Sequence, residues 1–150
     1  MMDAPFPQVD VGPTLFFSIV EFYHVGKKST TIPGYIDPII QDVLDTGIGI
    51  LSLDAPSSLE KAVETAAGKV VIMGNVPTAL FADGAKAEME SAVDACIRTA
   101  AAKGGYILAS GCEIPMNSTE DRIRRFFDYS HRAGREFIEG SGGPRGRGAE

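Results

Sequence analysis

The sequence predicts an α/β fold of four consecutive βα units with parallel strands. Four short apolar runs, rich in β-branched residues, are each followed by a turn and then by a helical pattern. Two of the runs, 48–53 and 69–73, are almost continuously apolar, which is typical of strands covered on both faces. Alternation of this kind favours a parallel sheet with right-handed crossovers.

The predicted strands are residues 18–25 (SIVEFYHV), 48–53 (IGILSL), 69–73 (KVVIM) and 105–109 (GYILA). The first predicted helix begins at Asp37-Pro38, as N-cap and first-turn proline, and ends before Gly47. The second begins with the capping box SSLE at 57–60 and ends at Gly68.

The third predicted helix covers 86–102 and is closed by Gly104, and the fourth begins at Ser118. Each has apolar positions at helical spacing, which predicts one buried face per helix. These positions are Met89, Val93, Cys96, Ile97 and Ala100 in the third helix, and Ile123, Phe126, Phe127, Ser130, Gly134 and Phe137 in the fourth.

Two architectures accept this order of elements: an open doubly wound sheet, or half of an eight-stranded (βα)₈ barrel. No GxGxxG or GxxxxGK[ST] follows a predicted strand, which weakens a nucleotide-binding reading. Residues 1–17 are predicted as an irregular lead-in and 18–139 as the folded domain. The glycine-rich segment 140–150 (GSGGPRGRGAE) is predicted as a flexible tail.

Composition narrows the class of protein. The chain has 150 residues, 44% of them hydrophobic, which is enough for one core. Its net charge of −6 argues against a general nucleic-acid binder, whose phosphate contacts come from Lys and Arg. No apolar run is long enough to span a membrane. Two cysteines make no disulfide framework, so we expect a cytoplasmic protein.

Polar or reactive side chains follow every predicted strand. In parallel α/β folds, ligands bind beside the loops that follow the carboxyl ends of the strands, here called the rim. His24 follows the first strand, Asp54 the second and Asn75 the third, while Cys112 and Glu113 follow the fourth. A structural role is open for His24, Asp54 and Asn75 as strand-end, cap and turn residues.

The two cysteines receive different predictions. Cys96 lies on the apolar stripe of a helix and is expected in the core, whereas Cys112 follows a glycine in a loop and is expected to be the accessible thiol. His131, on a helix beside Arg132, is expected at the surface.

Two segments carry a family resemblance. GKVVIMGNVPTALFADG, followed by GGYILASGCEIPMNSTEDRIRRFFDY, resembles the C-terminal half of the uroporphyrinogen decarboxylase superfamily. The GCEIP sequence is most similar to the methylcobamide:coenzyme M methyltransferase branch, because decarboxylases of the family have a glycine-histidine-glycine motif there. The resemblance implies the (βα)₈ barrel, so that this chain would form half of one.

The same resemblance implies a zinc site and a corrinoid partner. In the methyltransferase branch a His-x-Cys pair and the cysteine of the GC motif bind zinc, which activates a thiol. Cys112 matches the last ligand and His24 matches the histidine, while Gly26 stands where the branch has cysteine. The methylated cobamide would be presented by a partner corrinoid protein. Asp54, Asn75 and Glu113 are the predicted catalytic residues.

Three functions follow as hypotheses. The first is transfer of a methyl group from a methylated cobamide to a zinc-activated thiol. The second is a decarboxylase-type lyase that acts on a tetrapyrrole without a cofactor. The third is a non-catalytic half-barrel that serves assembly. Four βα units leave two open sheet edges, so a complementary barrel half or a second copy of the chain is expected as a partner.

Overall fold

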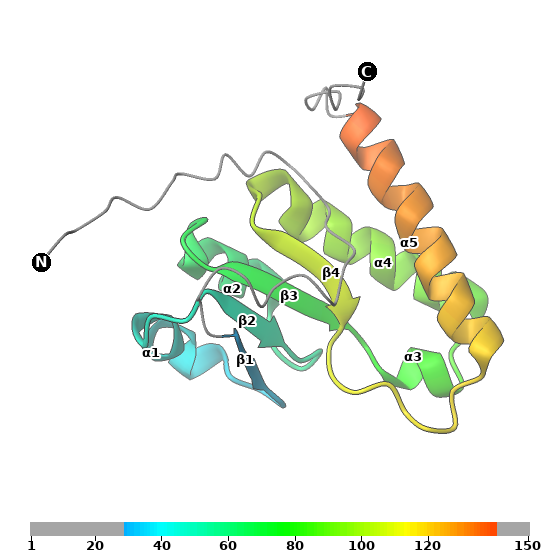
Figure 1. The fold of residues 1–150 in the computed structure, drawn as a ribbon, viewed down its shortest axis with the longest axis horizontal. Helices are drawn as coiled ribbons and strands as arrows, with labels where there is room; N and C mark the ends of the chain where they lie inside the picture. The colour runs from blue at the N-terminus through cyan, green and yellow to red at the C-terminus, as the bar shows by residue number, and fades with distance from the viewer. Residues whose placement is uncertain (1–28, 141–150) are drawn as a thin grey trace, which may run out of the picture.

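The computed structural model describes residues 29–140, and residues 1–28 and 141–150 lie outside the described part. Its four strands are all parallel and form one sheet in the order β1-β2-β3-β4 (Figure 1). Helices alternate with the strands along the chain. The predicted α/β class with parallel strands is therefore confirmed.

Apart from the first strand and one additional short helix, the elements follow the predicted order. The strands are β1 (Ser29–Ile32), β2 (Ile50–Leu53), β3 (Val71–Val76) and β4 (Tyr106–Ser110). The α-helices are α1 (Ile40–Asp45), α2 (Leu59–Ala66), α3 (Ala79–Ala82), α4 (Lys86–Ala100) and α5 (Glu120–Gly140). The 3₁₀ helix η2 (Asp37–Ile39) leads into α1, and a second one, η3 (Ala101–Lys103), follows α4.

The first strand of the described sheet differs from the prediction. The predicted strand 18–25 lies outside the described residues, and β1 is formed by Ser29–Ile32, for which the sequence predicts no element. Its residues STTI are mostly β-branched and suit a pleated strand. Because the segment is short and largely polar, it carries little hydrophobic periodicity, and only its pairing with β2 reveals it.

Two predicted helix starts are shifted. Ile36, not Asp37, is the N-cap of η2, and the Asp37 carboxylate instead accepts a hydrogen bond from the Ser58 amide at 2.9 Å. In α2 the N-cap is Ser58, whose hydroxyl accepts from the Lys61 amide at 3.2 Å, and not Ser57. Either of the two adjacent serines could cap the helix. The Ser57 hydroxyl is engaged by the loop after β1, so Ser58 is the N-cap.

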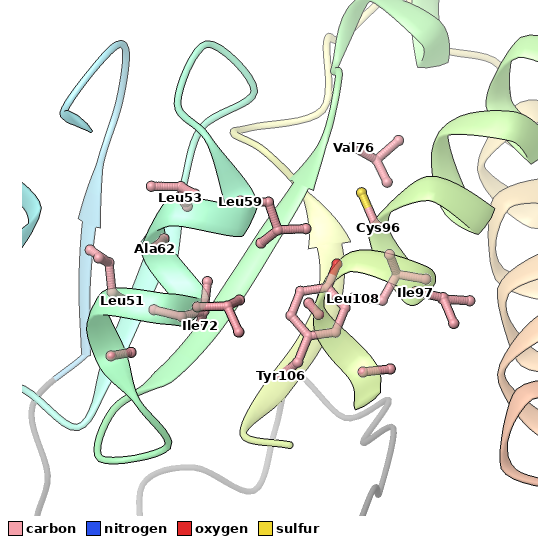
Figure 2. Close-up of a cluster of buried hydrophobic side chains, with 14 of the residues drawn as sticks. Leu51, Leu53, Leu59, Ala62, Ile72, Val76, Cys96, Ile97, Tyr106 and Leu108 are labelled. Carbon is pink, nitrogen blue, oxygen red and sulfur yellow. The ribbon is translucent and has the colours of Figure 1, made fainter. Parts of the chain in front are cut away.

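The core lies between the sheet and a layer of helices. The apolar stripe of α4 is buried as predicted, and Figure 2 shows Cys96 and Ile97 facing Val76 and the β4 side chains. At the α3–α5 end, the rings of Phe81 and Phe126 pack with centroids 5.0 Å apart. Phe127, expected on the buried face of α5, is 36% exposed. The run of two phenylalanines cannot put both rings on one helix face.

The opposite face of the sheet has a different set of side chains. The helix-facing core takes alternate strand residues such as Leu51, Leu53 and Ile72. The register aligns Thr31, Ser52, Met73 and Ile107 in one cross-strand row on the other face. No helix of residues 29–140 contributes to a core on this face.

Candidate functional site

The carboxyl ends of the four strands meet at one edge of the sheet, where the strand arrows of Figure 1 point. Gly34 follows β1, Asp54 follows β2, and Gly111 follows β4. Asn75 does not follow the third strand as predicted, because β3 continues through it to Val76. Residues from all four strand ends are therefore candidates for one shared site, and hydrogen bonds show which of them meet.

Asp54 lies at the centre of the rim. Its Oδ2 accepts a hydrogen bond from the Gly34 amide at 2.8 Å, and its Oδ1 accepts from the Ala55 amide at 2.7 Å. Its backbone carbonyl accepts from Nδ2 of Asn75 at 3.3 Å. One residue thus joins the exits of β1, β2 and β3. The carboxylate is partly exposed and retains lone pairs beyond those two bonds.

The β4 exit packs against the same residue. Gly111 is buried, and its amide donates to the Val76 carbonyl at 2.8 Å, which extends the β3–β4 ladder. A Cβ atom at this position would lie 2.7 Å from the Ala55 nitrogen and 3.2 Å from Oδ1 of Asp54. The absence of a side chain lets the β4 exit approach the β2 exit closely, and it holds Cys112 next to the Asp54 loop.

The two residues after Gly111 have different exposures. Cys112 is partly exposed and has a free thiol, whereas Glu113 is exposed. Both belong to the connection between β4 and α5, on the rim side of the sheet. Gly111, the neighbour of Cys112 in the chain, therefore packs against Asp54, while the roles of Cys112 and Glu113 stay predictions.

Asn75 is buried and fully engaged. Its Nδ2 donates to the Ser57 carbonyl at 2.9 Å as well as to the Asp54 carbonyl. Its Oδ1 faces the Cys96 thiol of α4, with Sγ 3.8 Å away. These contacts give the side chain a structural role that fastens β3 to α2 and α4. Its predicted catalytic role has no test in the structure.

A buried polar cluster lies below the rim on the helix side. The Tyr106 hydroxyl donates to the Gly74 carbonyl, and Figure 2 shows this hydroxyl near the Cys96 sulfur. Burial raises the pKa of the Cys96 thiol, and burial together with the neighbouring Cys96 raises the pKa of Tyr106 well above its usual value. Both groups are held neutral, so they act as core hydrogen-bonding groups and not as nucleophiles.

Ser57 is a rim residue that the sequence analysis assigned only to a cap. It is buried; its hydroxyl accepts from the Ile36 amide at 2.9 Å and donates to the Gly34 carbonyl at 3.0 Å. It therefore holds the loop after β1 against the start of α2. A serine just before an N-cap is the only sequence signal for this role, and that signal is common.

The predicted metal ligands are only partly described. His24 lies outside residues 29–140, so its distance to Cys112 is not defined. Within the described residues, no three His, Cys, Asp or Glu side chains are grouped as a metal site requires. Cys112 alone is a soft donor, and both Asp54 oxygens already accept amide hydrogen bonds. Residues 29–140 by themselves therefore do not complete a zinc site.

These features define the class of protein. Parallel strands alternating with helices, with loops meeting at the carboxyl edge, form part of a TIM-barrel-like α/β fold. Residues 22–133 match the family model described as Uroporphyrinogen decarboxylase (URO-D). The chain belongs to the uroporphyrinogen decarboxylase (URO-D) family.

Two curated relatives support this membership. Proteins named uroporphyrinogen decarboxylase from Paraburkholderia phytofirmans and Paraburkholderia xenovorans are each 28% identical to the chain over 106 residues. The match covers 70% of this chain and 28% of each relative. The chain thus spans little more than a quarter of the length of these relatives.

A solved structure has a similar fold. A methyltransferase from Methanosarcina mazei superposes with a TM-score of 0.60 at 21% sequence identity, over 73% of this chain and 31% of that chain. At this identity the similarity concerns the fold.

In the described part of the chain, no helix is both long and apolar enough to cross a membrane.

Proposed function

We propose that this chain is part of a corrinoid-dependent methyltransferase of the URO-D family, which moves a methyl group from a methylated cobamide to a thiol. The observation that carries the proposal is the position of Cys112 at the β4 exit, partly exposed and held against the Asp54 loop through Gly111. The GCEIP sequence at this point supports the methyltransferase branch, since it stands where decarboxylases of the family have glycine-histidine-glycine.

The chemistry sets tasks for residues of the rim. In methyl transfer the thiol loses its proton, its sulfur forms a bond to the methyl carbon, and the cobalt–carbon bond breaks with both electrons staying on cobalt. Positioning of the two reactants is the main contribution that a protein can make to such a displacement. The hydrogen-bonded, closely packed loop junction at Asp54 and Gly111 suits this task, and Glu113, exposed and next to Cys112 in the chain, is a carboxylate that can accept the proton.

Zinc and the partner belong to the same proposal as predictions. The resemblance predicts zinc on His24 and Cys112, although the described donors do not make a site by themselves. No step above depends on the metal. A partner corrinoid protein would bring the cobamide to the rim, and a complementary barrel half would add strands to the four that residues 29–140 form, toward a (βα)₈ barrel.

The test is methyl transfer by the purified chain. Methylcobalamin is mixed anaerobically with 2-mercaptoethanol, and the absorbance of cob(I)alamin is followed with and without protein. We expect a protein-dependent rate that falls at least about tenfold in Cys112→Ala. Ser91→Ala, on an exposed position of α4, should leave the rate unchanged. A rate equal to the protein-free background would contradict the proposal.

Metal analysis of the same samples tests the zinc prediction separately. The proposal expects zinc in the wild-type chain and its loss in Cys112→Ala and His24→Ala. Cys96→Ala is the matched control, because that thiol is buried in the core. Equal metal content in Cys112→Ala and wild type would show that Cys112 is not a zinc ligand. The methyl-transfer proposal would still stand or fall with the activity assay.

The decarboxylase function is the second candidate, and one observation favours it: both curated relatives are named uroporphyrinogen decarboxylase. In that reaction a carboxyl group leaves the tetrapyrrole as CO₂ and a proton takes its place. Incubation with uroporphyrinogen and chromatography of the products would show stepwise loss of carboxyl groups. A chain with neither activity that assembles into larger species would support the third hypothesis, a non-catalytic assembly half-barrel.

A further inference from the structure

A cavity of about 330 Å³ lies away from the strand-exit residues described above, between the α3–α4 connection and the first turns of α4 and α5. Figure 1 shows α3 next to the beginning of α5, where Phe81 of α3 contacts Phe126 of α5. The cavity combines apolar and charged side chains. It is lined by Leu80, Gly84, Ala85, Lys86, Met89, Glu90, Thr119, Asp121, Arg122 and Arg125.

Arg122 differs from the other cations of this cavity. Lys86 lies 3.7 Å from the carboxylate of Glu90, and Arg125 lies 2.6 Å from that of Asp121. Arg122 forms no ion pair with a carboxylate of residues 29–140. Its Nη1 donates instead to two backbone carbonyls, those of Gly84 at 2.9 Å and of Leu80 at 3.5 Å.

This arrangement leaves a positive charge without a counter-charge in a concave, partly buried place. Carbonyl groups satisfy hydrogen-bond donors but do not neutralise the charge of a guanidinium. Both carbonyl bonds use the same nitrogen, so the donors on the other nitrogens of Arg122 remain for a second partner. A carboxylate matches a guanidinium in charge and in planar shape.

We propose that this cavity binds a small organic carboxylate, with its anionic end at Arg122 and its apolar end against Leu80 and Met89. The volume lies at the lower end of the range for small-molecule sites, so a short chain fits better than a large ring system. Thr119, at the edge of the cavity, adds a hydroxyl that can donate to the same carboxylate. The site shares none of its lining residues with the proposed methyl-transfer rim.

The test is a titration of the full chain with butyrate, followed by ¹H–¹⁵N NMR. The Gly84 and Thr119 amides border the cavity and should shift as it fills. Butyramide has the same size without the charge and should bind at least about tenfold more weakly. Saturable shifts at Gly84 and Thr119 with butyrate, and weak ones with butyramide, are the expected result.

Two substitutions assign the binding to the cavity. Arg122→Gln should weaken butyrate binding about tenfold or more. Arg124→Gln is the matched control on the same helix, because its guanidinium pairs with Glu120 at 2.6 Å outside the cavity. It should leave the affinity unchanged. Equal affinity in Arg122→Gln and wild type, or equal binding of butyramide and butyrate, would overturn the proposal.

A second cavity variant covers the case in which Arg122→Gln does not fold, since Arg122 also fastens the end of α3. Lys86→Gln removes a lining charge whose side chain is 65% exposed, and it leaves the Gly84 and Leu80 carbonyls bonded. It should weaken butyrate binding about two- to fivefold. Wild-type affinity in Lys86→Gln, or the absence of Gly84 shifts in the wild type, would refute the site.

Discussion

The two thiols lie in contrasting surroundings, although the sequence separates them by only one helix and one strand. Cys96 is 6% exposed, and burial raises its pKa, so little thiolate forms near neutral pH. Cys112 is partly exposed in a loop. We expect iodoacetamide to alkylate Cys112 at least about tenfold faster than Cys96 in the native protein, as measured by mass spectrometry.

The unfolded protein is the control for this prediction. In denaturant the two cysteines should be alkylated at similar rates, because the difference comes from the fold and not from local sequence. Faster labelling of Cys96 under native conditions would mean that the α4 face opens more readily than its packing indicates.

Gly111 is the residue on which the rim geometry depends most directly. In Gly111→Ala the new methyl group would lie 2.7 Å from the Ala55 nitrogen, so the β4 exit must move away from the β2 exit. We expect a loss of about 1–3 kcal/mol in the free energy of unfolding, measured by urea denaturation. A methyl group at Gly140 would have no heavy atom within 4 Å, so Gly140→Ala is the control. Its free energy of unfolding should hardly change. Equal stability of the two variants would show that the strand exits are not in tight contact.

The sequence predicted that Asp54 and Cys112 follow strands, whereas Asn75, also expected after a strand, lies inside β3. It could not predict their partners. The bond from the Gly34 amide to Asp54 joins residues 20 positions apart, and it depends on β1, which carries too little apolar pattern to be recognised. Ser57 was missed for the same reason, since only the tertiary fold brings Gly34 and Ile36 to its hydroxyl.

At the scale of elements, β3, α4 and β4 share a polar contact inside the core. Asn75, Cys96 and Tyr106 each come from one of these elements, and burial raises the pKa values of the thiol and the phenol. The unfolded chain releases both protons at lower pH than the folded chain does. The stability due to the neutral groups is therefore fully present at neutral pH and is lost as the pH rises above the unfolded pKa of a thiol, about 8.5.

We therefore predict that the free energy of unfolding falls between pH 8 and pH 11. The slope should approach about 1.4 kcal/mol per pH unit for each group that titrates only in the unfolded chain. The double variant Cys96→Ala, Tyr106→Phe should have a shallower slope, measured by urea denaturation at several pH values. Tyr35→Phe is the control, because Tyr35 is 65% exposed. If the double variant and Tyr35→Phe both keep the wild-type pH slope of the free energy of unfolding, groups other than Cys96 and Tyr106 cause the alkaline effect.

Long helices with regular spacing were the elements that the sequence predicted best. The buried stripe of α4 matches the expectation residue by residue, because fifteen residues repeat the same period. Short elements were predicted less well. The four-residue helix α3 has no period to detect, and the start of α1 depends on Asp37 reaching Ser58, a contact outside its own helix.

At the scale of the whole molecule, the described sheet has helices on one face. Its second face includes the buried Ile50 and Ile107 beside Val71 and Met73, which are both partly exposed. Parallel sheets are normally covered on both faces. We expect the purified chain to sediment as dimers or larger species, heavier than the 15.9 kDa monomer. Met73→Gln should shift the distribution toward monomer by making that face more polar. A wild-type chain that is monomeric at micromolar concentration would contradict this expectation.

The hydrogen bonds of the β1 exit have a consequence for the kinetics of amide exchange. The Gly34 amide is bonded to Asp54 and the Ile36 amide to the buried Ser57 hydroxyl, although both lie in a connection without regular structure. Loop amides commonly exchange with solvent deuterium within seconds, whereas these two can exchange only when the bonds to Asp54 and Ser57 open. Their exchange rates would therefore record how often the strand ends separate, independently of the rarer event in which the whole chain unfolds.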